Sequence, residues 1–237
     1  MKRRFCSLFL ILCVAASGTA CGLFSTDLGL KHLKEKYPGY SFEFKGSADD
    51  VASYTVEGFD DWVVVRAAGD GEFYDNFLYV RYKDQILDSQ VGIMTEICSR
   101  LGVDDFNIAT YGYEGWMRDG VLTSNPDTSG QNARDYNTED LSFEEFMASA
   151  DSNNEFIGVI YLEDVDAIDR DEVAAIISDV IEESGCVYSL VRIDFTDNLD
   201  EFEYTFDKRW VVYDYQLMLQ GQTDENGQLI DFTWEEK

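Results

Sequence analysis

Two stretches of the chain repeat apolar residues at alternating steps of three and four, which is the spacing of an amphipathic helix. The first runs from Phe77 to Leu101, with Asp75 placed to cap its start and Asp84 alone interrupting the apolar stripe. The second covers 170–184, and its stripe has no polar member, consisting of Val173, Ile176, Ile177, Val180 and Ile181. We therefore expect two main helices, at about 76–101 and at 170–184.

Local signals mark where helices begin and end. Asp169 stands directly before the second stripe, and Gly185 follows it in the place where a left-handed residue commonly ends a helix. A shorter helix is expected after Ser142, because Glu145 three residues later completes a capping box. Another short helix is expected to end at Pro38.

Short apolar or alternating runs bounded by Gly, Asn and Asp predict strands. These runs are Tyr40 to Phe44, Val51 to Val56, Trp62 to Val65, Asp105 to Tyr113, Phe156 to Leu162, Cys186 to Phe195, Phe202 to Phe206, Trp210 to Leu219 and Leu229 to Trp234. A tight turn at Asn226-Gly227 joins the last two. Residues 115–140 are rich in turn formers and are expected to connect an N-terminal half, 28–114, to a C-terminal half, 141–237. The predicted fold class is α+β, with largely antiparallel sheets packed against the two main helices.

The first twenty residues have a different character from the rest of the chain. Lys2, Arg3 and Arg4 precede a stretch of twelve largely apolar residues, Phe5 to Ala16, and small residues follow. This layout is typical of a secretory signal, here 1–20. The apolar stretch is too short for a bilayer core, which requires about 20 helical residues.

Cys21 decides between two kinds of signal. Thr19, Ala20, Cys21 and Gly22 fit the pattern of a bacterial lipobox, in which the cysteine thiol carries a diacylglycerol. Gly18 stands where that pattern usually has Leu, so ordinary cleavage after Ala20 remains an alternative. The lipobox is favoured, and it implies a protein attached by lipid to the extracytoplasmic face of the cell membrane, with 21–27 as a tether.

Four segments carry a resemblance to a known group of proteins. They are Cys21-Gly22, Leu33-Lys34-Glu35-Lys36-Tyr37, Tyr74-Asp75-Asn76-Phe77-Leu78 and Leu141-Ser142-Phe143-Glu144-Glu145-Phe146. In this order the chain resembles small lipoproteins of clostridia and related Gram-positive bacteria. That family has no assigned activity, so the resemblance implies localisation and fold and leaves function open.

The charge of the chain limits its partners. Eighteen Lys and Arg face 47 Asp and Glu, a formal charge of −29. Residues 1–20 hold three of the basic residues and no acidic one, so the chain from Cys21 onward carries −32. This balance argues against nucleic acid and against peripheral binding to anionic lipid, both of which require Lys and Arg. A cationic peptide or protein is the partner that such a surface attracts, although solubility alone is the plainer interpretation.

Recognisable catalytic and metal motifs are absent from the sequence, and no cofactor is expected. The single histidine, His32, is interpreted as a solvated helix residue, since no Gly-x-Ser-x-Gly or Cys-x-x-Cys segment accompanies it. The run from Asp164 to Asp169 clusters carboxylates but lacks the spacing of a calcium loop, and Asp169 is better explained as a helix cap. Cys98 and Cys186 either pair or remain two buried thiols, and their apolar surroundings favour the second.

Aromatic residues crowd the C-terminal strands and give the one candidate binding surface, formed by Tyr204, Trp210, Tyr213, Tyr215 and Trp234. Such residues stack on peptides or glycans, or they form the inward face of a sheet, and the inward face is favoured. Two functions then stay open. The first is a non-catalytic binding or accessory lipoprotein, and the second is a carboxylate-dependent cell-envelope enzyme such as a glycan hydrolase, which needs only two suitably spaced carboxylates.

Overall fold

The computed structural model describes residues 28–48, 51–67, 72–110, 113–118, 121–126, 139–152, 154–198 and 215–237. The expected signal, the candidate lipid site Cys21, and the aromatic residues Tyr204, Trp210 and Tyr213 lie outside the described residues. By compactness the chain forms two units. Unit 1 is Met1–Arg81 with Arg134–Asp140, and unit 2 is Tyr82–Ala133 with Leu141–Lys237.

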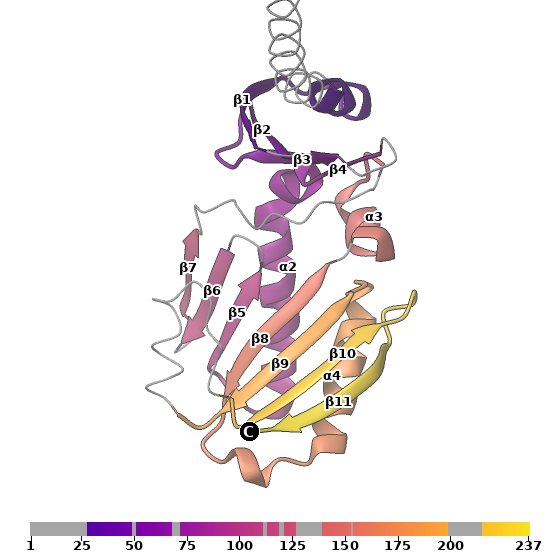
Figure 1. Ribbon diagram of the computed structural model, residues 1–237. Coiled ribbons are helices and arrows are strands. Elements are labelled where there is room, and N and C mark those ends of the chain that lie inside the picture. The colour runs from indigo at the N-terminus through magenta and orange to yellow at the C-terminus, as the bar shows by residue number, and fades with distance from the viewer. Residues whose placement is uncertain are drawn as a thin grey trace, which may run out of the picture. The chain divides into compact units, whose positions relative to one another are not determined.

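Unit 1 contains a four-stranded antiparallel sheet in the order β1-β2-β3-β4 (Figure 1). Its strands are β1 (Phe42–Ala48), β2 (Val51–Val56), β3 (Val63–Ala67) and β4 (Phe73–Asp75). The three strands predicted here are confirmed. β4 was not predicted, because three residues are too few to show a period of two.

Aromatic packing forms the core of unit 1. A helix over 28–36 approaches the sheet so closely that a Cβ at Gly29 would lie 2.6 Å from the hydroxyl oxygen of Tyr54. Phe77 is fully buried at the centre of four other rings, with centroid distances of 4.6 Å to Tyr37, 4.7 Å to Tyr40, 5.2 Å to Phe42 and 5.8 Å to Phe59. These ring contacts tie the end of the helix over 28–36 and the β1–β2 hairpin to the start of the long helix at Phe77.

Unit 2 contains a seven-stranded sheet in the order β11-β10-β9-β8-β5-β6-β7 (Figure 1). The strands are β5 (Phe106–Thr110), β6 (Tyr113–Arg118), β7 (Val121–Pro126), β8 (Glu155–Tyr161), β9 (Leu190–Thr196), β10 (Leu217–Thr223) and β11 (Leu229–Glu236). All neighbours pair antiparallel except β8 and β9, which are parallel and are joined through α4 (Arg170–Ser184). The predicted α+β class with largely antiparallel sheet is therefore confirmed.

One face of this sheet is covered by α4 and by the part of α2 (Phe77–Leu101) that belongs to unit 2, as Figure 1 shows. Register identifies the residues on that face, because Phe156 pairs with Val191 and Ile160 with Phe195, and all four are buried. The opposite face carries the alternate residues of β9, which include Arg192 and Asp194.

Both main helices are confirmed in extent, and α4 has the predicted ends. Asp169 accepts from the backbone N–H groups of Asp171 and Glu172, and Gly185 adopts the left-handed conformation, φ 68°. Within the predicted α4 stripe, Val173, Ile177, Val180 and Ile181 are buried, and Ile176 is half-buried. The predicted capping box between Ser142 and Glu145 begins α3 (Phe143–Met147).

The predicted stripe of α2 is largely buried, and the buried face is wider than the stripe. Of the apolar positions that step by three and four, Phe77, Val80, Leu87, Met94 and Cys98 are buried, Val91 and Leu101 are half-buried, and Asp84 is exposed. The buried face also includes Ile86, Gln90, Ile93 and Ile97. Asp75 does not occupy the cap position, because the helix begins at Phe77 and its first backbone bond ends on the carbonyl of Asn76. Asp75 lies one residue before the cap position, and its side chain accepts a hydrogen bond from the Phe77 N–H.

The expectation of a loop over 115–140 is wrong in its first part, since β6 and β7 continue the sheet beyond β5. These residues are strands because they pair with neighbouring strands, and a composition rich in turn formers gives no sign of that pairing. The compact units also divide the chain differently from the expected halves, 28–114 and 141–237, with a boundary between Arg81 and Tyr82. The predicted run from Cys186 to Phe195 starts too early, since β9 begins at Leu190, and within the predicted run from Trp210 to Leu219 β10 begins at Leu217. The predicted strand Phe202 to Phe206 lies outside the described residues.

Two short 3-10 turns complete the described secondary structure, at Ala150–Ser152 and Val165–Ala167. Cys98 and Cys186 are both buried and free, as the interpretation as two separate thiols predicts. Across the described part of the chain, no helix combines the length and the hydrophobicity that a membrane crossing requires.

Candidate functional site

Ionisable side chains of unit 1 converge on Asp75, at the end of β4. Its side chain is fully buried, and its Oδ2 accepts from His32 Nε2 and Lys36 Nζ, each at 2.8 Å. Its Oδ1 accepts from the Tyr37 hydroxyl at 2.9 Å and from the Phe77 N–H at 3.0 Å. Four donors thus occupy the four acceptor positions that a carboxylate offers. We refer to Asp75, His32, Lys36 and Tyr37 as the Asp75 cluster.

The electrostatics of the Asp75 cluster keep the carboxylate ionised. Burial opposes its charge, but the hydrogen bond from His32, the charge and hydrogen bond of Lys36 and the Phe77 N–H outweigh that cost and lower the pKa of Asp75 from its usual value. Burial and the neighbouring negative charge of Asp75 raise the pKa of the Tyr37 hydroxyl far above its usual value. Tyr37 therefore remains a phenol that donates.

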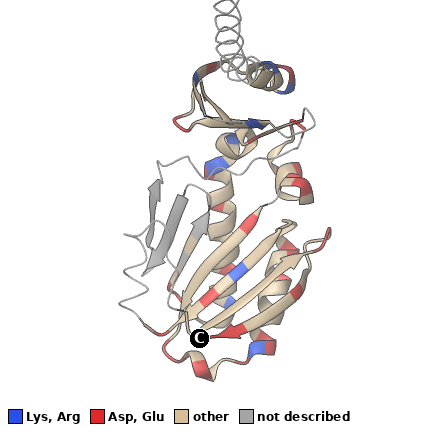
Figure 2. Ribbon diagram, viewed as in Figure 1, with Lys and Arg blue, Asp and Glu red and all other residues tan. Residues whose placement is uncertain are grey.

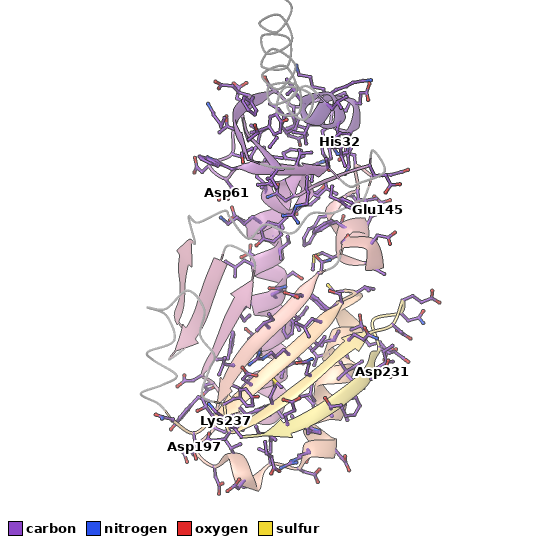
Figure 3. The ribbon with its side chains drawn as sticks, viewed as in Figure 1. His32, Asp61, Glu145, Asp197, Asp231 and Lys237 are labelled. Atoms are coloured by element: carbon purple, nitrogen blue, oxygen red, sulfur yellow. The ribbon has the colours of Figure 1, made fainter. Side chains whose placement is uncertain are left out.

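A saturated carboxylate of this kind holds structure together. A hydrolytic triad requires the second nitrogen of the histidine to face a nucleophile. The contacts described for His32 are Asp75 and the ring of Phe73, whose centroid lies 5.6 Å away. Figure 3 shows His32 on the helix over 28–36, so the Asp75 cluster fastens this helix to β4 and to the start of α2.

The prediction that His32 is a solvated helix residue is wrong, because its side chain is only 20% exposed. One signal for the Asp75 cluster was present, since His32 and Lys36 are four residues apart and share a helix face. The acceptor lies 43 residues beyond His32, however, and only the fold brings the two together.

A second buried carboxylate lies in unit 2, on the sheet face opposite α4. Asp194 on β9 is fully buried and receives two hydrogen bonds from Arg192, at 2.9 and 2.8 Å. The two residues are two apart on one strand, so their side chains share a face. Burial raises the pKa of Asp194, and the hydrogen bonds and charge of Arg192 offset only part of that shift.

Two of the five candidate binding aromatics are described. The Tyr215 ring lies 5.5 Å from the Arg192 guanidinium carbon and 6.0 Å from Lys237 Nζ, both cation–π contacts. Trp234 is half-buried on β11 and packs against Phe195 with a centroid distance of 5.8 Å. Trp234 thus faces the helix-covered side, as the favoured interpretation predicts, whereas Tyr215 contacts the side chain of Arg192 on the opposite side.

Acidic side chains gather along α4 and β11, where Figure 2 shows several red segments and little blue. Together they carry eight acidic residues and one basic residue, Arg170. In the described ranges, no three His, Cys, Asp or Glu side chains are arranged to hold a metal ion. Asp164 and Asp169, the ends of the clustered carboxylates, instead accept backbone N–H groups at the starts of their helices.

Comparison with known proteins adds no further assignment. The chain matches no protein-family model, no curated protein and no solved structure.

Proposed function

We propose that this protein is an exported, lipid-anchored lipoprotein that binds a cationic peptide or protein outside the cell and performs no catalysis itself. The observation that carries the proposal is the charge of −32 from Cys21 onward. A field of this sign attracts cations over distances of a Debye length and repels nucleic acid and anionic lipid. Because the negative charge opposes peripheral binding to anionic lipid, the proposed covalent lipid on Cys21 is what would hold the chain at the membrane surface.

The position of the anchor is consistent with a membrane-proximal unit 1. The seven residues of 21–27 span at most about 25 Å when fully extended. They lead directly to the helix over 28–36, which the Asp75 cluster fastens to β4. Unit 1 would therefore stay within a short distance of the lipid.

The anchor is tested by fractionating cells that express Cys21→Ala. We expect this variant to appear in the medium or to remain uncleaved, because the proposed lipid attachment is lost. Normal cleavage combined with full retention in the membrane fraction would contradict the lipoprotein assignment. Cys98→Ala is the matched control, since a buried thiol elsewhere in the chain has no part in anchoring.

Binding is tested with labelled Lys-rich peptides and the full-length protein in non-ionic detergent, at two salt concentrations. The Debye length falls from about 30 Å at 0.01 M salt to about 8 Å at 0.15 M, so nonspecific attraction should largely disappear at the higher value. A specific site keeps measurable affinity there, because desolvated contacts are screened less. Absence of binding at both concentrations would contradict the proposal.

The alternative is a carboxylate-dependent cell-envelope enzyme, which the 47 Asp and Glu of the chain leave open because glycoside hydrolysis needs only two suitably spaced carboxylates. Asp194, whose pKa is raised by burial, is the carboxylate chosen for the test, although its side chain is fully buried and bonded to Arg192. Peptidoglycan fragments incubated with the wild type and with Asp194→Asn separate the two functions. Turnover that the substitution abolishes would replace the binding proposal with the enzyme.

A further inference from the structure

We infer that β11 is the docking edge for the cationic partner, which adds to the seven-stranded sheet as an extended basic strand. The inference rests on the proposed function and assigns it a place on the molecule. β11 lies at one end of the strand order, and Figure 1 shows it as the outermost strand on that side. An edge strand presents backbone N–H and C=O groups that another chain can pair with.

Register identifies the groups that face outward. The backbone N–H of Lys237 donates to the carbonyl of Gln216 at 3.2 Å, so this pair faces inward, between β11 and β10. Antiparallel pairing alternates at every residue, which turns the backbone groups of Glu236 and Trp234 away from β10. A partner strand can exchange hydrogen bonds with both residues.

A bulge limits the edge at its other end. Two residues of β11, Asp231 and Phe232, face the single Gly221 of β10, and Asp231 adopts a φ of 53°. Bulges are one of the devices that end pairing at an edge. Among the described strands, none pairs with the outer side of the regular segment from Thr233 to Glu236, so a partner strand can pair there.

Apolar side chains next to this segment are left uncovered. Phe232 is 44% exposed and Ile230 is 36% exposed. Among the described residues, these are the two large apolar side chains of unit 2 that are exposed, and both lie on β11. Large exposed apolar groups concentrated on one edge strand are typical of an interaction surface.

The charge along the edge selects the partner. β11 carries Asp231, Glu235 and Glu236 and no basic residue. α4 runs beside β11 and adds five further carboxylates. Two contacts join the elements: Arg170 of α4 pairs with Glu236, and Glu182 of α4 accepts a hydrogen bond from Gln228, just before β11. A second copy of this chain would bring like charges into contact, which destabilises pairing. A strand that alternates apolar residues with Lys or Arg places its own apolar side chains near Phe232 and its cations near the carboxylates.

The test uses a fluorescent eight-residue peptide of alternating Lys and Val, with the full-length protein in non-ionic detergent at about 0.15 M salt. The control peptide carries N-methyl groups on two consecutive central residues, which block an amide on each edge of the strand and leave the charge unchanged. We expect the control to bind about tenfold more weakly or worse, because it loses backbone hydrogen bonds. Fluorescence anisotropy measures both affinities.

Matched variants locate the site. Phe232→Lys should weaken binding of the first peptide about tenfold through lost apolar contact and added repulsion. Trp62→Lys, the same kind of change at a 54% exposed aromatic residue of unit 1, should leave it unchanged. If Phe232→Lys fails to fold, Glu235→Lys at an exposed position of the same edge replaces it, with Glu57→Lys of unit 1 as its control.

The outcomes separate this inference from the proposed function. Equal binding of both peptides, or equal effects of Phe232→Lys and Trp62→Lys, would overturn strand addition and leave cation binding in place. No peptide binding at all would overturn both. Sedimentation of a wild-type dimer that Phe232→Lys dissociates would assign the edge to a second copy of the chain instead.

Discussion

Asp75→Asn removes the charge at the centre of the Asp75 cluster and changes the shape of the side chain very little. The new amide keeps one oxygen, which can still accept from Tyr37 and Phe77, but its nitrogen faces the donors of His32 and Lys36. Removing one partner of a buried ion pair costs about 3–5 kcal/mol. Because the side chains of Lys36 and His32 are 13% and 20% exposed, water can partly solvate them after the change. We therefore expect a loss of about 3 kcal/mol in the free energy of unfolding.

The measurement is urea unfolding of the wild type and the variant, followed by circular dichroism. With a slope of about 1–3 kcal/mol per molar urea, a loss of this size lowers the midpoint by about 1–3 M. Asp60→Asn is the control, since it removes the same charge at an exposed position of unit 1. A midpoint for Asp75→Asn that matches the control would refute the argument that the Asp75 cluster stabilises unit 1.

The dependence on pH provides a second check of the same cluster. The pKa of Asp75 in the folded protein lies below its usual value of 3.8. Its ionised form therefore stabilises the fold fully above the unfolded-state pKa, and this stabilisation is lost as the pH falls through the lowered folded-state pKa. The difference between wild type and Asp75→Asn should be complete at pH 7 and should shrink below about pH 4. A difference that stays constant down to acid pH would mean that ionisation of Asp75 contributes nothing.

Three other changes test the packing of unit 2. Ile177→Asp places a carboxylate at a fully buried position of α4 and should lower the free energy of unfolding by several kcal/mol, about enough to unfold a domain of ordinary stability. The control Ala175→Asp, on the exposed side of the same helix, should shift a thermal melt by only a few degrees. Gly221→Ala should destabilise the protein by about 1–3 kcal/mol, because the new Cβ would lie 2.9 Å from the Cβ of Phe232 on β11. Gly92→Ala, in open space on α2, should stabilise it by about 0.5–1 kcal/mol. The urea midpoints of the two variants measure both effects. Burial and nearby carboxylates raise the pKa of the Cys98 thiol to about 12, so iodoacetamide should modify it only after unfolding, and rapid modification of the native protein would contradict its burial.

Several elements could be predicted from the sequence because their signals are local. Asp169 and Gly185 delimit α4, and Ser142 with Glu145 begins α3, since a capping residue bonds to backbone groups two or three positions away. Asn226-Gly227 forms the predicted turn, with Gly227 at φ 83°. In each case the interacting atoms belong to one short segment, so the order of residues alone determines the contact.

Features that depend on contacts between residues far apart in the chain were decided only by the tertiary structure. β6 and β7 lie in residues whose composition predicted a loop, and they are strands because β5 offers them an edge to pair with. The buried face of α2 is wider than the predicted stripe and also includes Ile86, Gln90, Ile93 and Ile97, because the elements packed against the helix, and not the helix period alone, determine which positions are covered.

The candidate sites show the same division. The sequence determines the negative charge, the signal-like first twenty residues and the presence of a single histidine, since these are properties of composition and order. It does not determine that His32 and Lys36 meet Asp75, or that β11 ends the sheet with Phe232 uncovered. Those facts follow from strand order and register, which are chosen by the simultaneous packing of many segments, and no single segment encodes that choice.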